Sequence, residues 1–259
     1  MSRAFAREGS RRRRHEANAF SRCVSTPIIV ALGGSLLGPE VDENHSWLSD
    51  LCDACVELTR RGEKLGLVVG GGFRAREAIA EARATISDVA ELDEIGIAAT
   101  RVNASIIIRA LKARGLDVCA EIPETWHEGA SALSTHPIVV MGGTEPGHTT
   151  DNVAIRLAIC CKATRCIIAT NVAHVYDSDP RINPNARTIE NMTLSELQGI
   201  VGPPQHGKAG GSGVIDPIGV AAAVEENLPL AVLDGRDPSI LRSAILGGTF
   251  TGTTIRTDE

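Results

Sequence analysis

Glycine clusters follow three apolar runs of the chain, and they carry its clearest capacity for binding chemistry. They are Gly33-Gly34 after residues 28–32, Gly70-Gly71-Gly72 after residues 65–69, and Gly142-Gly143 after residues 137–141. Because glycine has no side chain, the backbone can come close to a phosphate and direct its amide N–H groups at it. One glycine pair predicts only a tight turn, whereas three such clusters favour a cleft for an extended phosphate chain.

The familiar nucleotide-binding motifs do not account for this cleft. The sequence contains no G-x-x-x-x-G-K-[ST] loop, and no G-x-G-x-x-G motif opens a helix after the first expected strand. It also lacks the catalytic-loop and D-F-G signatures of protein kinases. Phosphate must therefore be bound by backbone amides, one or two arginines and a metal ion.

Apolar runs that are typical of strands alternate with segments of helical periodicity from Pro27 onward. We expect strands at 28–32, 65–69, 137–141, 165–170, 230–233 and 253–255, and helices at about 46–61, 74–84, 87–114, 151–163, 193–200, 216–227 and from 238. Residues 179–186 contain two prolines and two asparagines and are expected to form a loop. This alternation predicts a mostly parallel sheet with helices on both faces. Ligands of such sheets bind beyond the carboxyl ends of the strands, where the glycine clusters lie.

The composition is that of a globular α/β protein. Of the 259 residues, 43% are hydrophobic and only 3% are aromatic, so the core must consist of Val, Ile, Leu and Ala. No apolar run approaches the ~20 residues of a membrane-spanning helix, which argues against a membrane protein. Residues 1–26 carry a charge of +5 and the other 233 residues carry −11. An acidic body is a poor surface for nucleic acid, because that binding depends on neutralising phosphates with Lys and Arg.

The N-terminal segment and the cysteines bear on domain organisation and compartment. Residues 1–26 have no apolar segment after their arginines, so we expect an Arg-rich disordered extension, followed by a single domain at 27–259. The seven cysteines are odd in number, and Cys52-x-x-Cys55 has no second pair or His cluster to complete a zinc site. Reduced thiols in the cytoplasm are therefore expected.

Several motifs together give the chain a specific resemblance. Leu32-Gly33-Gly34-Ser35, Val68-Val69-Gly70-Gly71-Gly72 with Arg76, and Met141-Gly142-Gly143-Thr144 resemble the amino acid kinase superfamily. The run Gly142-Gly143-Thr144-Glu145-Pro146-Gly147-His148-Thr149-Thr150-Asp151, with Thr100-Arg101-x-Asn103 and Val214-Ile215-Asp216-Pro217, is similar to the archaeal-type uridylate (UMP) kinases. The resemblance covers about residues 28–255. It implies a three-layer αβα sandwich, a homohexamer, and ATP- and Mg²⁺-dependent phosphorylation of UMP to UDP in pyrimidine nucleotide synthesis.

On the donor side, the resemblance implies that the first glycine cluster, with Ser35, contacts the transferring phosphates. From the second cluster, Gly72 binds the phosphates of ATP together with Arg76, whereas Gly71 contacts UMP. The ATP-binding candidates are Ala31, Leu32, Gly33, Gly34, Ser35, Gly72, Arg76, Thr170, Asn171, Tyr176 and Asp179. The last four of these residues would line the adenine and ribose pocket. No metal ligand from the protein is expected, since Mg²⁺ would arrive with ATP.

On the acceptor side, the resemblance implies a loop that wraps the UMP base and phosphate. The UMP-binding candidates are Gly71, Asp93, Thr144, Glu145, Pro146, Gly147, His148, Thr149 and Thr150. The Asp93 carboxylate can accept hydrogen bonds from both sugar hydroxyls, and threonine hydroxyls can bind phosphate without adding a charge. The catalytic candidates are Gly34, Ser35, Arg76 and Asp151. The alternative for Asp151 is a cap of the helix that starts there.

The chain departs from the family's pattern mainly on the donor side. Ala31 stands where many superfamily members have a lysine, and Ala173-His174 follow Val172 where the family usually has Asp-Gly. The phosphate charge would then be met by Arg76, by amides, by Mg²⁺ and, as one hypothesis, by Lys208. These departures favour a weaker or altered use of the phosphate donor over a change in the acceptor molecule.

The expected reaction needs positioning and charge neutralisation more than acid–base chemistry. A phosphate oxygen of UMP is already ionised at neutral pH, so its in-line attack on the γ-phosphorus of Mg·ATP needs no general base. Two alternatives remain. One is a superfamily kinase with another acceptor, such as isopentenyl phosphate, carbamate or N-acetylglutamate. The other is a non-catalytic protein that binds a nucleotide or oxyanion on the same fold.

Overall fold

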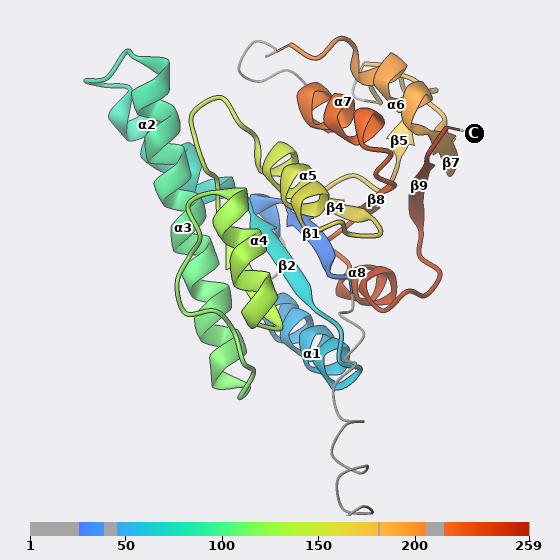
Figure 1. Cartoon of the computed structure of the whole chain (residues 1–259). Helices are drawn as coiled ribbons and strands as arrows, with labels where there is room; N and C mark the ends of the chain where they lie inside the picture. Colours follow the sequence, from blue (N-terminus) through green and yellow to red (C-terminus); the bar gives the residue numbers. More distant parts are fainter. Residues whose placement is uncertain (1–25, 39–45, 181, 206–214, 259) are drawn as a thin grey trace, which may run out of the picture.

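The computed structural model describes residues 26–38, 46–180, 182–205 and 215–258 (Figure 1). The expected N-terminal extension and the hypothesis on Lys208 therefore lie outside the described residues. Within the described ranges, no helix is long and apolar enough to cross a membrane. The six cysteines of the same ranges form no disulfide, and Cys52 and Cys55 are buried.

A seven-stranded sheet forms the centre of the molecule, in the spatial order β3-β2-β1-β4-β8-β9-β7. The strands are β1 (Ile28–Leu32), β2 (Leu65–Val69), β3 (Ile138–Met141), β4 (Cys166–Thr170), β7 (Asn191–Thr193), β8 (Leu230–Asp234) and β9 (Gly252–Arg256). Every neighbouring pair is parallel except β8 and β9, which run antiparallel. A small second sheet pairs β5 (Val175–Tyr176) with β6 (Thr188–Ile189). The expectation of a mostly parallel sheet is confirmed.

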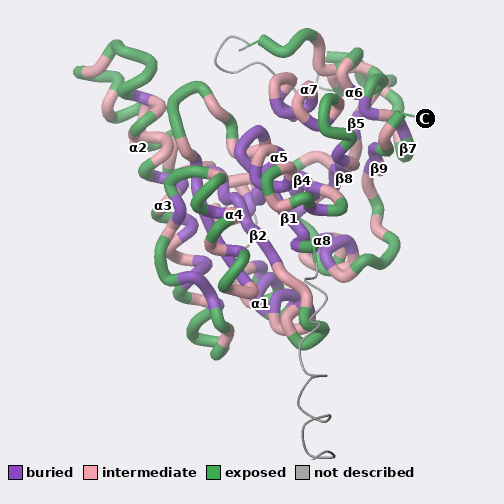
Figure 2. Tube along the Cα trace, in the orientation of Figure 1, coloured by how far each residue is buried: buried purple, intermediate pink, exposed green. Residues whose placement is uncertain are grey.

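Helices cover both faces of the sheet, which gives the expected αβα layers. One hydrophobic cluster joins the sheet to α1 (Ser46–Arg60), α3 (Val89–Ala113) and α8 (Pro238–Ile245). The other joins it to α4 (Trp126–Thr135), α5 (Thr150–Cys160), α6 (Leu194–Val201) and α7 (Pro217–Glu225). In β1, Val30 and Leu32 face the first cluster while Ile29 and Ala31 face the second. Burial on both faces explains why the strands are continuous apolar runs (Figure 2).

Two short elements stand at the carboxyl edge of the sheet. The 3₁₀ helix η2 (Gly34–Leu37) follows β1 directly, and α2 (Gly72–Ala82) follows β2. Helix α2 has no fully buried residue; it packs against α3 and η2 and projects from the body of the molecule (Figures 1 and 2). It begins at Gly72, two residues before its expected start, so its first turn grows directly out of the glycine cluster.

Helix α4 is an element that the sequence expectations missed. The sequence does contain a helix-start signal at the N-terminal end of α4, where Thr125 and Glu128 have the spacing of a capping box. The Thr125 hydroxyl accepts a hydrogen bond from the Glu128 amide at 3.1 Å, and the Glu124 amide donates to Glu128 Oε2 at 2.9 Å. Only Gly129 and Leu133 of α4 are buried, so the apolar stripe is too sparse to reveal the helix by periodicity.

Candidate active site

The ends of the central parallel strands are joined to one another by main-chain hydrogen bonds. Gly33 N donates to Ala169 O at 2.8 Å, Gly70 N donates to Leu32 O at 2.8 Å, and Gly235 N donates to Thr170 O at 2.8 Å. The loops that follow β1, β2, β4 and β8 therefore start from fixed positions along one edge. This edge is the one at which open parallel sheets bind their ligands.

The first two glycine clusters touch each other. A Cβ on Gly34 would overlap the amide nitrogen of Gly72, and a Cβ on Gly72 would overlap the carbonyl of Gly34. Gly72 also has a φ of +57°, in the left-handed region that favours glycine. Glycine is thus required at both positions. The ATP-binding candidates Ala31 and Leu32 are 1% and 0% exposed as whole residues, and both belong to the hydrophobic clusters that flank the sheet.

Helix α3 holds the third glycine cluster. The Thr100 hydroxyl, which is 7% exposed as a residue, accepts a hydrogen bond from Gly143 N at 2.7 Å and donates to Ile97 O at 2.6 Å. A Cβ on Gly142 would overlap that same hydroxyl. Thr100 belongs to a motif that the sequence singled out, but only the structure shows that it fixes the start of the acceptor loop.

Two carboxylates anchor the acceptor loop, residues 144–150. Asp93 of α3 accepts a hydrogen bond from Gly147 N at 2.9 Å through its Oδ2 atom. Asp216, 9% exposed, accepts from the Thr149 hydroxyl at 2.8 Å and caps α7 by accepting from Ile218 N and Gly219 N. The Thr149 hydroxyl also caps α5. The structure therefore brings Asp93 to the acceptor loop and gives Asp93 and Thr149 partners within the chain.

One buried hydroxyl of this loop lacks a partner among the described residues. Thr144 Oγ1 is buried and makes no hydrogen bond within the described part of the chain. A buried hydroxyl without a partner is costly, because it has lost its water. An acceptor molecule that offers a hydrogen-bonding edge to the loop would satisfy it.

Aromatic and charged side chains pack against the other end of the loop. His148 Nδ1 lies 3.0 Å from Glu145 Oε1, and the His148 ring centroid is 5.7 Å from that of Trp126. The guanidinium carbon of Arg156 lies 5.2 Å from the Trp126 ring centroid, within the range of a cation–π contact. Trp126 and Arg156 were not among the sequence candidates; they connect the loop to α4 and α5.

Asp151, in the first turn of α5, carries an unusual carboxyl. Burial raises its pKa to about 7, and the negative charge of Asp216 adds to the shift. The α5 cap is Thr149, so the alternative interpretation of Asp151 as the cap is wrong. With a pKa of about 7 this carboxyl is about half protonated at pH 7, which lowers the average negative charge beside a site for anions.

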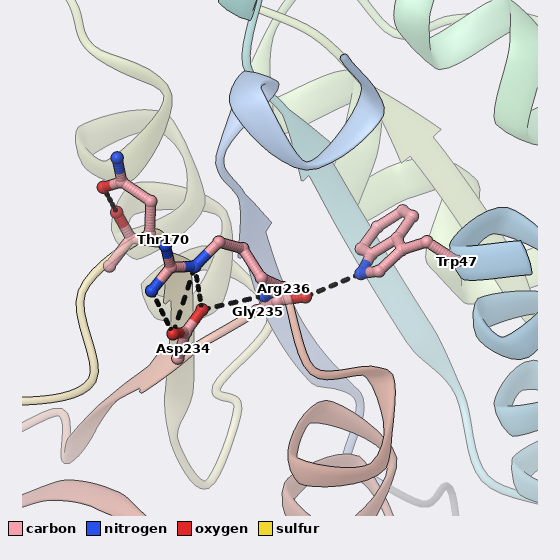
Figure 3. Close-up of polar contacts among 6 residues, drawn as sticks. Trp47, Thr170, Asp234, Gly235 and Arg236 are labelled. Carbon is pink, nitrogen blue, oxygen red and sulfur yellow. Dashed lines mark hydrogen bonds and ion pairs between the residues drawn. The ribbon is translucent and has the colours of Figure 1, made fainter. Parts of the chain in front are cut away.

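The donor side contains a charged pair that the sequence expectations missed (Figure 3). At the end of β8, the Arg236 guanidinium binds both carboxylate oxygens of Asp234, with Nε at 2.9 and 3.1 Å and Nη2 at 2.5 Å. This guanidinium holds the pKa of Asp234 below its ordinary value. Trp47 Nε1 donates to Gly235 O at 2.6 Å, which ties α1 to the same turn. Thr170 lies next to this turn, since its carbonyl accepts from Gly235 N.

The remaining donor candidates occupy the surface near this edge. Asn171 is exposed and Tyr176 and Asp179 are half-buried, on the segment that contains β5. Arg76 lies exposed on α2. Arg74, two residues earlier, donates from Nη1 to Asn103 Oδ1 at 3.0 Å and to Leu37 O at 3.3 Å.

The chain is similar to known proteins over most of its length. The model of the amino acid kinase family matches residues 26–234. The uridylate kinase of Methanococcus maripaludis is 38% identical over 88% of this chain and 98% of its own, and that of Methanococcoides burtonii is 39% identical over 89% and 97%. The crystal structure of the Archaeoglobus fulgidus uridylate kinase has a TM-score of 0.74 at 32% identity, with 88% of this chain and 99% of that chain covered. The UMP kinase structure from Bacillus anthracis, at 22% identity and a TM-score of 0.71, shows similarity of fold alone.

Proposed function

The chain belongs to the amino acid kinase family, and from this premise we propose that it is a uridylate kinase that transfers the γ-phosphoryl group of ATP to UMP, giving UDP and ADP. The observation that carries the proposal is the meeting of the three glycine clusters at one sheet edge. The loops that follow β1, β2, β4 and β8 form the donor side, and the loop that follows β3 is the acceptor loop. The two substrates can then approach each other across Gly34, Gly71 and Gly143.

On the acceptor side, Thr144 Oγ1 supplies a hydrogen-bonding group to UMP and the loop residues 145–150 wrap around it. Asp93 already accepts one hydrogen bond from Gly147 N. A carboxylate has about four lone-pair sites, so Asp93 can also accept from the sugar hydroxyls. Binding the sugar would then fix the same side chain that fixes the loop.

On the donor side, Gly33, Gly34 and Ser35 contact the transferring phosphate, and Gly72 and Arg76 contact the other phosphates of ATP. Thr170, Asn171, Tyr176 and Asp179 take the adenine and ribose. Mg²⁺ enters as part of the substrate Mg·ATP.

The chemistry requires little from acid–base groups. The attacking phosphate oxygen of UMP is already ionised, so the chain's contribution is to align the two substrates and to stabilise the charge on the transferring group. Amide N–H groups and arginines do this without reorganising during the reaction. Asp151, with its pKa raised to about 7, adds less repulsion toward the phosphates than an ordinary aspartate would.

The assembly, the compartment and the pathway are parts of the same proposal. Exposed apolar side chains on α3, with Val102 52% exposed and Val89 65% exposed, offer a surface for the expected homohexamer. Light scattering of the purified chain measures its mass directly. Reduced cysteines and a substrate of pyrimidine nucleotide synthesis fit the cytoplasm.

A substrate panel tests the proposal. The chain is mixed with Mg·ATP and, separately, with UMP, CMP, AMP, GMP, isopentenyl phosphate, carbamate or N-acetylglutamate, and products are separated by chromatography. We expect UDP and ADP in equal amounts with UMP. Turnover only with a non-nucleotide acceptor would show another kinase of the superfamily. Nucleotide binding without any product would show a non-catalytic binder.

A further inference from the structure

Asn103 of α3 is a fully buried polar side chain that the proposed reaction has not yet used. It is 0% exposed, and its Nδ2 atom donates to Gly70 O at 2.7 Å and to Gly71 O at 3.1 Å. Two consecutive carbonyls of the second glycine cluster are therefore bound by one side-chain amide. Its oxygen accepts from Arg74 Nη1 at 3.0 Å, so both polar atoms of the Asn103 amide are engaged.

These bonds fix the direction of the amides that follow. In a trans peptide the C=O of one residue and the N–H of the next point in opposite directions. Because Asn103 draws the carbonyls of Gly70 and Gly71 toward α3, the N–H groups of Gly71 and Gly72 point away from α3. The amides thus face the side of the loop that lies against Gly34.

The backbone conformation at these glycines is suited to an anion. Gly71 is right-handed, with φ −77° and ψ −35°, and Gly72 has φ +57°. A right-handed residue followed by a left-handed one directs successive N–H groups into a concavity, called a nest, that binds anions. The nest opens at the N-terminus of the eleven-residue helix α2, where the helix dipole adds a positive potential.

Arg74 determines which way the Asn103 amide is turned. Its guanidinium presents N–H groups to Asn103 Oδ1 and to Leu37 O at the end of η2. A reversed Asn103 amide would place N–H groups against the guanidinium and an oxygen against two carbonyls. Arg74 therefore links η2, α2 and α3 around the nest. It is an exposed residue that lies two positions before Arg76 in the sequence.

We propose that Asn103 and Arg74 are positioning residues that hold the Gly71–Gly72 nest in its anion-binding form for the phosphates of the donor; this rests on the proposed function. Neither side chain contacts the ligand. They act through the orientation of the glycine amides, which is why the buried residue of the pair is a neutral amide and the charged one lies at the surface.

The test compares two variants with a matched control. Asn103→Leu removes the bonds to the glycine carbonyls, and Arg74→Met removes the orienting partner from the surface. Lys64→Met is the control, because Lys64 Nζ also donates to two consecutive carbonyls, Leu133 O at 2.6 Å and Ser134 O at 3.0 Å, at the far end of the sheet. For each chain we measure the Kd for inorganic tripolyphosphate by calorimetry, the melting temperature, and KM for ATP and UMP separately.

We expect Asn103→Leu to raise the Kd for tripolyphosphate and the KM for ATP by about tenfold, and Arg74→Met by about threefold. The KM for UMP should change less than the KM for ATP, because only Gly71 of the nest is also a UMP-binding candidate. Arg74→Lys, which keeps a donor near Asn103, should recover most of the loss. Lys64→Met should change the melting temperature but not the affinity for tripolyphosphate.

Each other outcome has a defined meaning. If Asn103→Leu folds and binds tripolyphosphate as the unaltered chain does, the proposal is wrong; if it does not fold, an unchanged Kd in Arg74→Met overturns it. If the unaltered chain does not bind tripolyphosphate, the proposal is also wrong. If the unaltered chain binds tripolyphosphate but makes no UDP, the proposed function is wrong. The Kd values of the two variants then still test whether Asn103 and Arg74 hold the nest.

Discussion

The donor-side loops, residues 33–35 and 70–72, and the acceptor loop are held by different kinds of bond. The donor-side loops depend on main-chain hydrogen bonds to neighbouring strands and on the neutral amide of Asn103. The acceptor loop depends on the carboxylates of Asp93 and Asp216. No carboxylate anchors the described residues of the donor-side loops in the way that Asp93 and Asp216 anchor the acceptor loop.

The difference follows from what each region has to bind. A carboxylate beside the glycine nest would repel the phosphates, so the donor-side loops are fixed by neutral groups, by the cation of Arg74 and by steric contact between glycines. The acceptor loop can use carboxylates because it must also contact sugar hydroxyls, which donate to them. We therefore expect the donor side to lose function when a substitution changes the shape of its loops. We expect the acceptor side to lose function when a substitution removes a single hydrogen bond.

The largest effect is expected from Gly34→Ala. Its Cβ would overlap Gly72 N and the Gly70 carbonyl, so the two donor-side loops must separate. Overpacking of this kind costs on the order of 3 kcal/mol, which corresponds to about a hundredfold loss in kcat/KM. Steady-state kinetics measures it. Gly199→Ala, in α6, is the control and should keep full activity, because the added Cβ would have no atom of the described residues within 4 Å other than the adjacent backbone of its own helix.

Thr144→Val comes next and addresses the acceptor loop. The change keeps the shape of the side chain and removes the buried hydroxyl that has no partner in the described chain. Loss of a hydrogen bond to UMP should raise its KM by about tenfold and leave the KM for ATP unchanged. A rise in the KM for ATP instead would mean that Thr144 belongs to the donor side, and the division between the two regions would be wrong.

A smaller effect, on stability, is expected from Asp151→Asn. The carboxyl has an ordinary pKa of 3.8 in the unfolded chain and a pKa of about 7 in the folded one. Between these values the folded state binds more protons, so its stability relative to the unfolded state falls as pH rises. Asparagine does not titrate. The melting temperature of the variant minus that of the unaltered chain should therefore increase by a few degrees between pH 5 and pH 7. A constant difference across that range would contradict the raised pKa.

The smallest effect is expected from Arg236→Gln, at the charged turn beside the donor side. Asp234 and Arg236 form a well-aligned pair, but the Arg236 side chain is 52% exposed. Exposed ion pairs contribute about 0–1 kcal/mol and are screened by salt. Denaturant unfolding should show a loss within that range that disappears in about 1 M NaCl. A larger loss would mean that charge, and not only main-chain bonding, holds the donor side.

The fold was predictable from the sequence because its strands are buried on both faces. Runs such as those of β1 and β2 are apolar at every position, and each is followed by glycine. Helix α4 was missed because few of its residues are buried. The position of the three glycine clusters at one edge of the sheet was predictable as well, since they follow parallel strands, which end together.

The internal contacts of the site were not predictable. Asp93 and Gly147 are 54 positions apart, and Asn103 and Gly70 are 33 apart, so no periodicity links them. The sequence also favoured Arg76 over Arg74 for an active role. Only the positions of α2, η2 and α3 in space show that Arg74 contacts Asn103. Side-chain partners depend on tertiary packing, which local patterns do not encode.

The position of β9 inside the sheet sets an order on folding during synthesis. β7 and β8 both depend on β9, which is made last, because β9 lies between them. Until residues 252–256 leave the ribosome, β8 presents an open edge next to Leu230 and Val232, which are buried in the finished molecule. Open apolar edges of this kind pair readily with other chains. A chain that ends before Gly252 is therefore expected to aggregate, however complete its catalytic edge.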